Sequence, residues 1–247
     1  MKQFHWSSTL GNRFRQVNYA STLADWTPWA TNAKDELGDL LVKPEIVAFL
    51  KFNEKYFHYL DPEEFFELAG GSEAWPSPRS WTDASEAIKT RERRYQANGW
   101  KDEDGKKISH SEWQEEQEDI LAKSVGKEAA RAFTGYQKLM DKISPSDIEK
   151  VWTNGKDAPK WTSLSIDEKH AYISAVVFKK KDAKELTEAE MDSFADWIIA
   201  NKDSAMAVKC INLIQEMIPS LWKNDYWKDE VKGKFVDAFP NIFNKAK

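Results

Sequence analysis

Hydrophobic positions along most of the chain recur three and four residues apart, which is the period of an amphipathic helix and not of a strand. Several of these stretches begin with a capping residue or a proline, followed by an acidic residue, as helices often do. We therefore predict a mainly α-helical protein. The expected helix starts are Pro44 and the sequences DPEE at 61, SHSE at 109, SPSD at 144, SIDE at 165 and TEAE at 187.

The middle of the chain is expected to hold a loop followed by two helices. Residues 98–110 are rich in Gly, Asp and Lys, which is typical of an exposed connection. The two helices after the loop are separated near Gly126. The second of them has a predicted apolar face made by Ala130, Phe133, Tyr136, Leu139 and Met140.

A softer break at 153–161 precedes three more stretches of helical period. We expect a helix for each of them, and thus a helical C-terminal region beginning at about residue 151. Their apolar faces are Tyr172, Ile173, Val176 and Val177; Met191, Phe194, Trp197 and Ile198; and Ala205, Val208, Ile211, Leu213, Ile214 and Met217.

Alternation of apolar and polar residues, the signal of a half-buried strand, is nearly absent. The one short candidate is residues 14–19, where Phe14 and Val17 are apolar. A lone strand needs a sheet to join, and the remaining sequence offers almost no partners for it.

Composition adds limits on partners and location. The 247 residues carry 36 basic and 41 acidic side chains, a net charge of −5, so no overall positive field attracts a phosphate backbone. The single cysteine, Cys210, lies in an apolar run and is expected to be a small buried residue. No run is long and apolar enough for a membrane span and no signal-peptide pattern opens the chain, so we expect a cytoplasmic protein.

Common catalytic and metal-binding motifs are missing from the sequence. The four histidines, among them His170, are scattered without metal-ligand spacing. The stretch 99–107 fails as a phosphate loop because its spacing is one residue too long and its acidic residues would repel a nucleotide. The basic run 89–94 is interpreted as a solvated helix face, with a partner or nucleic-acid contact as the alternative.

Two arginines lie in unusual settings. Arg13 is part of LGNRFRQVNY, and Arg79 follows two prolines in WPSPRSW at 75–81. The prolines fix an extended turn, and Ser80 is expected to cap the next helix with Asp83 three residues on. Arg79 is therefore predicted at a rigid helix entrance.

These motifs, in this order, resemble the end of the MoxR-type AAA+ ATPases. The family's core ends in an Asn/Asp-Arg-Phe tripeptide leading into its last strand, here NRFRQVNY, followed by a helix, here TLADWTPWA. A segment like KPEIVAFLKFNEKYFHYLDP and a Ser-Pro-Arg turn that opens a lid helix come next. SVGKEAARAFTGYQKLM also resembles the lid of bacterial and phage members. The resemblance covers roughly residues 8 to 150, and the rest fits loosely.

The resemblance implies a domain plan and roles for both arginines. It implies a remnant of the AAA+ core with one β-strand at 1–20, a helical lid at 21–150 and a helical extension at 151–247. Arg13 would be the arginine finger that reaches the nucleotide of a neighbouring subunit, and Arg79 the sensor-two arginine that contacts the γ-phosphate in its own subunit. A guanidinium suits this role because it is always charged and offers directed donors.

One departure from the family matters for activity. The chain has no G-x-x-x-x-G-K-[ST] loop and no acidic Mg²⁺ motif. We therefore expect no ATP hydrolysis by this polypeptide alone, and ATP with Mg²⁺ only in a complex with a nucleotide-binding core chain. The chain would be half of a split ATPase, a truncated product or a repurposed lid.

The implied function is to complete and gate ATP hydrolysis in an oligomeric, chaperone-like remodelling machine. Its partners would be the core chain or complete AAA+ subunits and, by family association, a von Willebrand A-type protein. Two alternatives remain at this point. One is an all-α adaptor or scaffold without a nucleotide role, and the other is a helical nucleic-acid-binding protein, which the acidic balance disfavours.

Overall fold

The computed structural model of the chain describes residues 21–58, 74–181 and 183–243. In these ranges it contains eleven α-helices and no β-strand, which confirms the expected mainly α class. None of these helices is long and apolar enough to cross a membrane. Arg13, the strand expected at 14–19 and the helix start expected at 61 lie outside the described residues.

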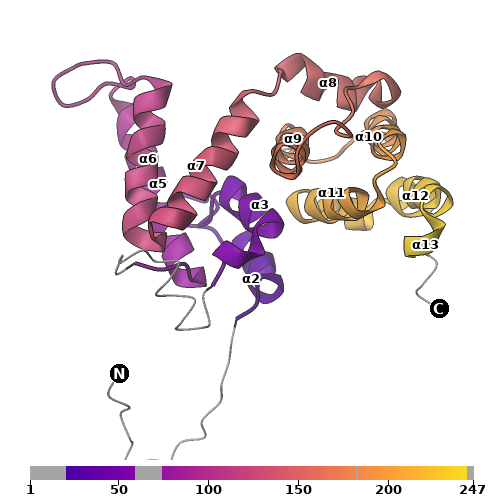
Figure 1. The fold of residues 1–247 in the computed structure, drawn as a ribbon, viewed down its shortest axis with the longest axis horizontal. Coiled ribbons are helices and arrows are strands. Elements are labelled where there is room, and N and C mark those ends of the chain that lie inside the picture. Colours follow the sequence, from indigo (N-terminus) through magenta and orange to yellow (C-terminus); the bar gives the residue numbers. More distant parts are fainter. Residues whose placement is uncertain (1–20, 59–73, 182, 244–247) are drawn as a thin grey trace, which may run out of the picture.

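Five helices form the N-terminal half of the molecule (Figure 1). Helices α5 and α6 lie side by side and are joined by the loop that was expected at 98–110. Helix α7 follows α6 directly, with Gly126 between them. The bounds are Leu23–Ala30 for α2, Pro44–Phe52 for α3, Pro78–Ala97 for α5, His110–Val125 for α6 and Lys127–Asp141 for α7.

Three of the predicted helix starts are closed by reciprocal capping boxes. In each one the hydroxyl of a Ser or Thr accepts a hydrogen bond from the N–H of a Glu three residues on, and the carboxylate of that Glu accepts one from the N–H of the capping residue. These bonds satisfy backbone donors that a helix leaves unpaired at its start. The pairs are Ser109 with Glu112, Ser165 with Glu168, and Thr187 with Glu190.

The core of the N-terminal half is built around aromatic rings. Phe49 of α3 is buried, and its ring lies 5.4 to 5.9 Å from four other rings, measured between centroids. Those rings come from α5, from α7 and from the 3-10 turn Glu54–Tyr56, so one helix joins three elements. The four are Tyr56, Trp81, Phe133 and Tyr136.

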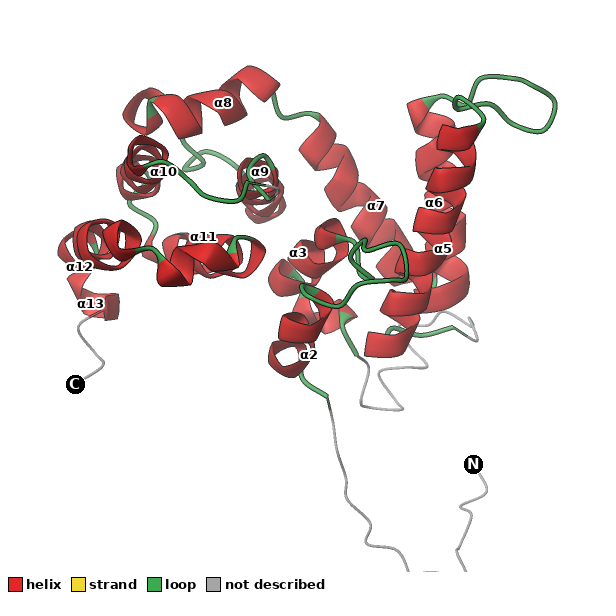
Figure 2. Ribbon diagram, turned by 180° about the vertical axis from the view of Figure 1, so that it is seen from behind, coloured by secondary structure: helices red, strands yellow, loops and turns green. Residues whose placement is uncertain are grey.

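Six helices form the C-terminal half, and they are drawn in salmon, orange and yellow in Figure 1. Figure 2 shows the same halves from behind, with loops connecting helices throughout the described part. The bounds are Pro145–Thr153 for α8, Ile166–Phe178 for α9, Glu188–Ala200 for α10, Ser204–Met217 for α11, Lys232–Ala238 for α12 and Pro240–Phe243 for α13.

Three short elements complete the C-terminal half. Two are 3-10 helices, η2 at Gly155–Asp157 and η3 at Pro219–Lys223. The third, η4 at Trp227–Val231, is a π-helical turn that runs directly into α12.

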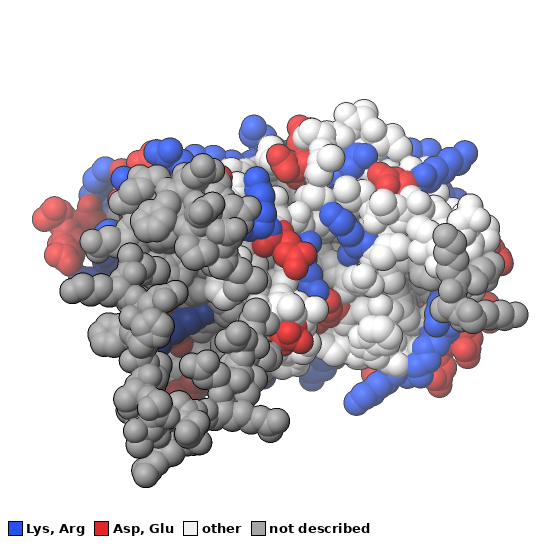
Figure 3. Space-filling model, turned by 60° about the horizontal axis from the view of Figure 1, so that its bottom comes forward, with Lys and Arg blue, Asp and Glu red and all other residues white. Residues whose placement is uncertain are grey.

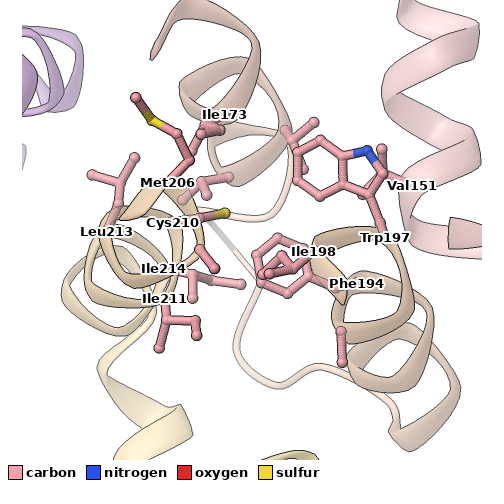
Figure 4. Packing of buried hydrophobic residues seen from close by; sticks show 14 of the residues in the cluster. Val151, Ile173, Phe194, Trp197, Ile198, Met206, Cys210, Ile211, Leu213 and Ile214 are labelled. Atoms are coloured by element: carbon pink, nitrogen blue, oxygen red, sulfur yellow. The ribbon is translucent and has the colours of Figure 1, made fainter. Parts of the chain in front are cut away.

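In the first two turns of α11, the buried positions are shifted along the sequence from the predicted ones. Ala205 is exposed and Val208 half-buried, whereas Met206, Ala207 and Cys210 are buried. The helix packs against α9 and α3 as well as α10, so its buried surface is turned away from the face that period alone suggested. Figure 4 shows Cys210 and Ile214 of α11 facing Phe194 and Ile198 of α10. The buried position expected for Cys210 is confirmed, and burial raises the pKa of its thiol.

The element η2 packs against the backbone of α10 at Gly155. The Gly155 N–H donates a hydrogen bond of 2.7 Å to Ser193 Oγ, and Ser193 Oγ donates one of 2.8 Å to the Val151 carbonyl. A Cβ atom on Gly155 would lie 1.7 Å from the Ser193 carbonyl oxygen. Only a residue without a side chain permits this approach.

Helix α3 contributes to both hydrophobic cores. Ile46, Val47, Phe49 and Leu50 belong to the core of the N-terminal half. Ala48 and Phe52 belong to the core of the C-terminal half. Because the two halves share this helix and α7 also packs against α9, the division of the chain at 150/151 stays a prediction.

A buried histidine lies where the two halves meet. His170 of α9 is 3 % exposed, and its ring stacks on Phe52 with centroids 4.2 Å apart. Neither ring nitrogen has a hydrogen-bond partner within the described residues. Lys209 Nζ also lies over the Phe52 ring, 5.7 Å from its centroid. Burial, and then the charge of Lys209, lower the pKa of His170 from 6.5 to about 4.

We expect the folded protein to lose stability in mild acid through His170. Below pH 6.5 the unfolded chain takes up a proton on this ring, while the folded ring stays neutral until about pH 4. Unfolding therefore becomes easier as the pH falls through this window, by about 3 kcal/mol in total. His170→Phe should remove this loss. Urea unfolding at several pH values measures the unfolding free energy of both proteins. If that free energy fell equally with pH in the wild type and in His170→Phe, the loss of stability would not come from His170.

Candidate functional site

The turn before α5 is capped differently from the prediction. Ser77, and not Ser80, is the N-cap, because Pro78 takes the first helical position, where its fixed φ and missing N–H are tolerated. The N–H of Ser80 donates to Ser77 Oγ at 3.1 Å, and the N–H of Ser77 donates to Ser80 Oγ at 2.8 Å. Arg79 is consequently the second residue of α5. The expectation of a helix entrance at Arg79 is confirmed, and the capping role given to Ser80 with Asp83 is wrong.

Contacts on three sides hold the backbone of this turn. Ser80 Oγ donates to the Trp75 carbonyl at 2.9 Å, and Trp81 Nε1 donates to the Tyr56 carbonyl at 2.8 Å. On the α6–α7 side, Gly126 has φ +86°, and a Cβ there would lie 2.8 Å from the Ala74 carbonyl oxygen. The Arg79 backbone is thus fixed between the core and the α6–α7 junction.

The side chain of Arg79 extends into solvent. It is 91 % exposed, and its Nε lies 3.8 Å from Asp83 Oδ2, one helical turn away. At that distance and exposure the ion pair contributes little to stability. The guanidinium is therefore free to turn toward a ligand at small cost.

Arg79 borders a surface hollow of about 330 Å³. Two of its lining side chains are cations, Arg79 and Lys123, and Lys123 is exposed in the last turn of α6. The N-terminus of the 20-residue helix α5, with its partial positive charge, adds to them. Asp83 is the acidic side chain on this rim. The residues that line the hollow are Ala74, Trp75, Ser77, Arg79, Ser80, Asp83, Lys123 and Ser124.

This arrangement is suited to an anion. The Arg79 guanidinium, the Lys123 ammonium and the Ser124 hydroxyl can all donate hydrogen bonds to phosphate or carboxylate oxygens, whereas the Ser77 and Ser80 hydroxyls already donate within the turn. A divalent metal has no matching site, since the described part of the chain contains no group of three or more His, Cys, Asp or Glu side chains arranged around one point. The second predicted site residue, Arg13, lies outside the described residues, so its position relative to Arg79 stays a prediction.

The basic run 89–94 is not the freely solvated face that the sequence suggested. Arg93 Nη2 lies 2.7 Å from Asp35 Oδ2, and Lys89 Nζ lies 3.1 Å from the same oxygen. The Arg93 guanidinium holds the pKa of Asp35 well below its usual range. Arg91 pairs with Glu116 at 2.8 Å. These acids come from the loop after α2 and from α6. The basic run is therefore neutralised by tertiary contacts, which hydrophobic period and composition do not reveal.

The charge distribution gives little support to a nucleic-acid role. On the face shown in Figure 3, basic and acidic side chains are interspersed among the described residues and form no broad basic stripe. Arg94, at the end of the basic run, also pairs with an acid, Glu103. Nonspecific nucleic-acid binding requires clustered positive charge on the protein, which releases counterions from the phosphate backbone on contact.

Sequence reasoning missed a second hollow, of about 360 Å³, at the junction of the two halves. It lies among the start of α3, the middle of α5 and the end of α11. Its charged side chains are matched: Lys43 pairs with Glu92 at 2.7 Å, and Lys181 lies 3.5 Å from Glu45. No local signal marks this hollow, because its walls come from segments far apart in the sequence.

Comparisons with known proteins found no match. No protein-family model, no curated protein and no solved structure matches this chain.

Proposed function

We propose that the chain supplies the lid and helical extension of a MoxR-like AAA+ ATPase and acts together with a nucleotide-binding core. The observation that carries the proposal is the position of Arg79. It is the second residue of a long helix, its backbone is held on several sides, and its side chain is exposed beside a second cation, Lys123. The order of sequence motifs around it supports the same interpretation.

In this proposal Arg79 contacts the γ-phosphate of an ATP that the core chain holds. Phosphoryl transfer spreads negative charge over the γ-phosphate oxygens, and a guanidinium already in place stabilises that charge with little ordering cost. The hollow fits this role, since its donor groups suit phosphate oxygens. The residues for Mg²⁺ and for the phosphate loop are not found among the 247 residues and would come from the core chain.

The extension from about 151 would place the lid within an oligomeric remodelling complex. Its partners would be the core chain, neighbouring subunits and a von Willebrand A-type protein, and the complex would work in the cytoplasm. The adaptor alternative keeps the same fold but gives Arg79 no role.

The test is to mix the purified chain with a core polypeptide that carries a Walker-type loop and is encoded beside it. We expect ATP hydrolysis by the mixture to exceed the sum of the separate chains, and no hydrolysis by this chain alone. Co-elution on a sizing column in the presence of ATP checks assembly. Co-elution without any change in hydrolysis would favour the adaptor alternative over the lid.

A further inference from the structure

A third hollow, of about 190 Å³, lies in the C-terminal half, away from Arg79. It is formed by the C-terminal part of α11, η3, the π-helical turn η4 and α12. Single π-helical turns are rare and are frequent at functional sites. The lining residues are Ile211, Asn212, Gln215, Leu221, Trp222, Trp227, Lys228, Lys232 and Phe235.

The floor of this hollow is apolar, and one rim residue is an exposed indole. Leu221, Trp227 and Phe235 are buried and belong to the core of the C-terminal half. Trp222, by contrast, is 61 % exposed and is not part of that core. Exposed tryptophans beside an apolar pocket are typical anchors of protein interfaces, because the ring buries a large area with few rotatable bonds.

The charges on the hollow have one sign. Its two ionisable lining residues are Lys228 and Lys232, and no acidic side chain lines it. Lys228 Nζ lies 3.0 Å from Asp225 Oδ1, whereas Lys232 is exposed and has no ion pair within the described residues. The amides of Asn212 and Gln215 add hydrogen-bond donors. A ligand that fits therefore combines an apolar side chain with carboxylates.

We propose that this hollow docks a segment of a partner protein in which an aromatic or aliphatic side chain is flanked by Asp or Glu. The apolar side chain packs between Trp222 and the floor, and the carboxylates face Lys232 and Lys228. An apolar floor favours a peptide over a nucleic acid, whose bases would stack on Trp222 but leave the floor unfilled. The proposal is independent of the role of Arg79.

The probe is a short fluorescein-labelled peptide of alternating glutamate and phenylalanine, measured by fluorescence anisotropy with the full chain. Matched peptides replace phenylalanine by serine or glutamate by lysine, and an oligothymidine of similar length represents nucleic acid. We expect binding of the first peptide only, weakened by added salt because surface charges take part.

Trp222→Ala should raise the dissociation constant of that peptide about 30-fold, as expected for a tryptophan that anchors an interface. Lys232→Glu should raise it about tenfold. The matched controls are Trp29→Ala, another exposed tryptophan, and Lys223→Glu, an exposed lysine outside the hollow; both should bind as the wild type does. Equal affinity of wild type and Trp222→Ala, or binding of the oligothymidine in place of the peptide, would overturn the proposal.

Discussion

Arg79→Ala should lower the ATP hydrolysis of the reconstituted complex on the order of 10³-fold, as the loss of a charge-stabilising arginine does in phosphoryl transfer. The fold should stay intact, because the side chain is 91 % exposed and the Ser77 and Ser80 capping bonds do not involve it. Arg131→Ala is the matched control, since Arg131 is an exposed arginine on α7 with a weak contact to Glu118. Steady-state hydrolysis together with far-UV circular dichroism gives both readouts.

Mixed complexes distinguish a role in the same subunit from a role in the next one. Protomers with Arg13→Ala, mixed with protomers whose phosphate loop is defective, should regain some activity, because some interfaces pair an intact pocket with an intact finger. Arg79→Ala in the same mixture should regain none, because both defects damage their own subunit's pocket. Equal recovery in the two mixtures, or wild-type rates from either single variant, would show that the arginines are assigned wrongly.

Gly155→Ala should destabilise the chain by about 3 kcal/mol or more, the upper range for an overpacked site. Its Cβ would lie 1.7 Å from the Ser193 carbonyl oxygen and 2.9 Å from the Trp197 nitrogen. Both are backbone atoms of α10, so no side-chain rotation can relieve the clash. Moving η2 away would also break the hydrogen bond to Ser193 Oγ. Urea unfolding followed by tryptophan fluorescence measures the change.

Gly135→Ala is the control for this experiment. Gly135 lies within α7, and a Cβ there has no atom within 4 Å, so the change should leave stability unchanged or raise it by up to about 1 kcal/mol. Ser193→Ala tests the same contact from the other side and should cost about 1 to 3 kcal/mol, because it leaves the Gly155 N–H and the Val151 carbonyl without their partner. Unchanged unfolding midpoints for Gly155→Ala would refute this account of the contact.

Local sequence signals predicted the helices well because their causes are local. Capping boxes such as Ser109 with Glu112 act within one turn, and the break at Gly126 follows from its positive φ. The misplaced cap at Ser80 has a local cause too: two overlapping capping patterns are present, and the proline at 78 favours the earlier one. The preference of proline for the first helical position therefore decides between the two patterns.

Tertiary features were beyond the reach of the same signals. The pairing of the basic run with Asp35 and Glu116, and the matched charges around the junction hollow, depend on segments brought together from distant parts of the chain. For the candidate site, the sequence predicted Arg79 at a helix entrance but not its neighbour Lys123, which comes from another helix. Contacts between residues that are far apart in the sequence cannot be predicted from the hydrophobic period of a single sequence.

The sharing of α3 between the two cores links the thermodynamics of the halves. Melting either half removes the surface on which one side of this helix rests, so the unfolding free energies of the two halves are coupled. A cut at 150/151, which falls within α8, would separate Ala48 and Phe52 from the other residues of the core to which they belong. The two pieces would then have a built-in affinity for each other, as fragments that complement one another do.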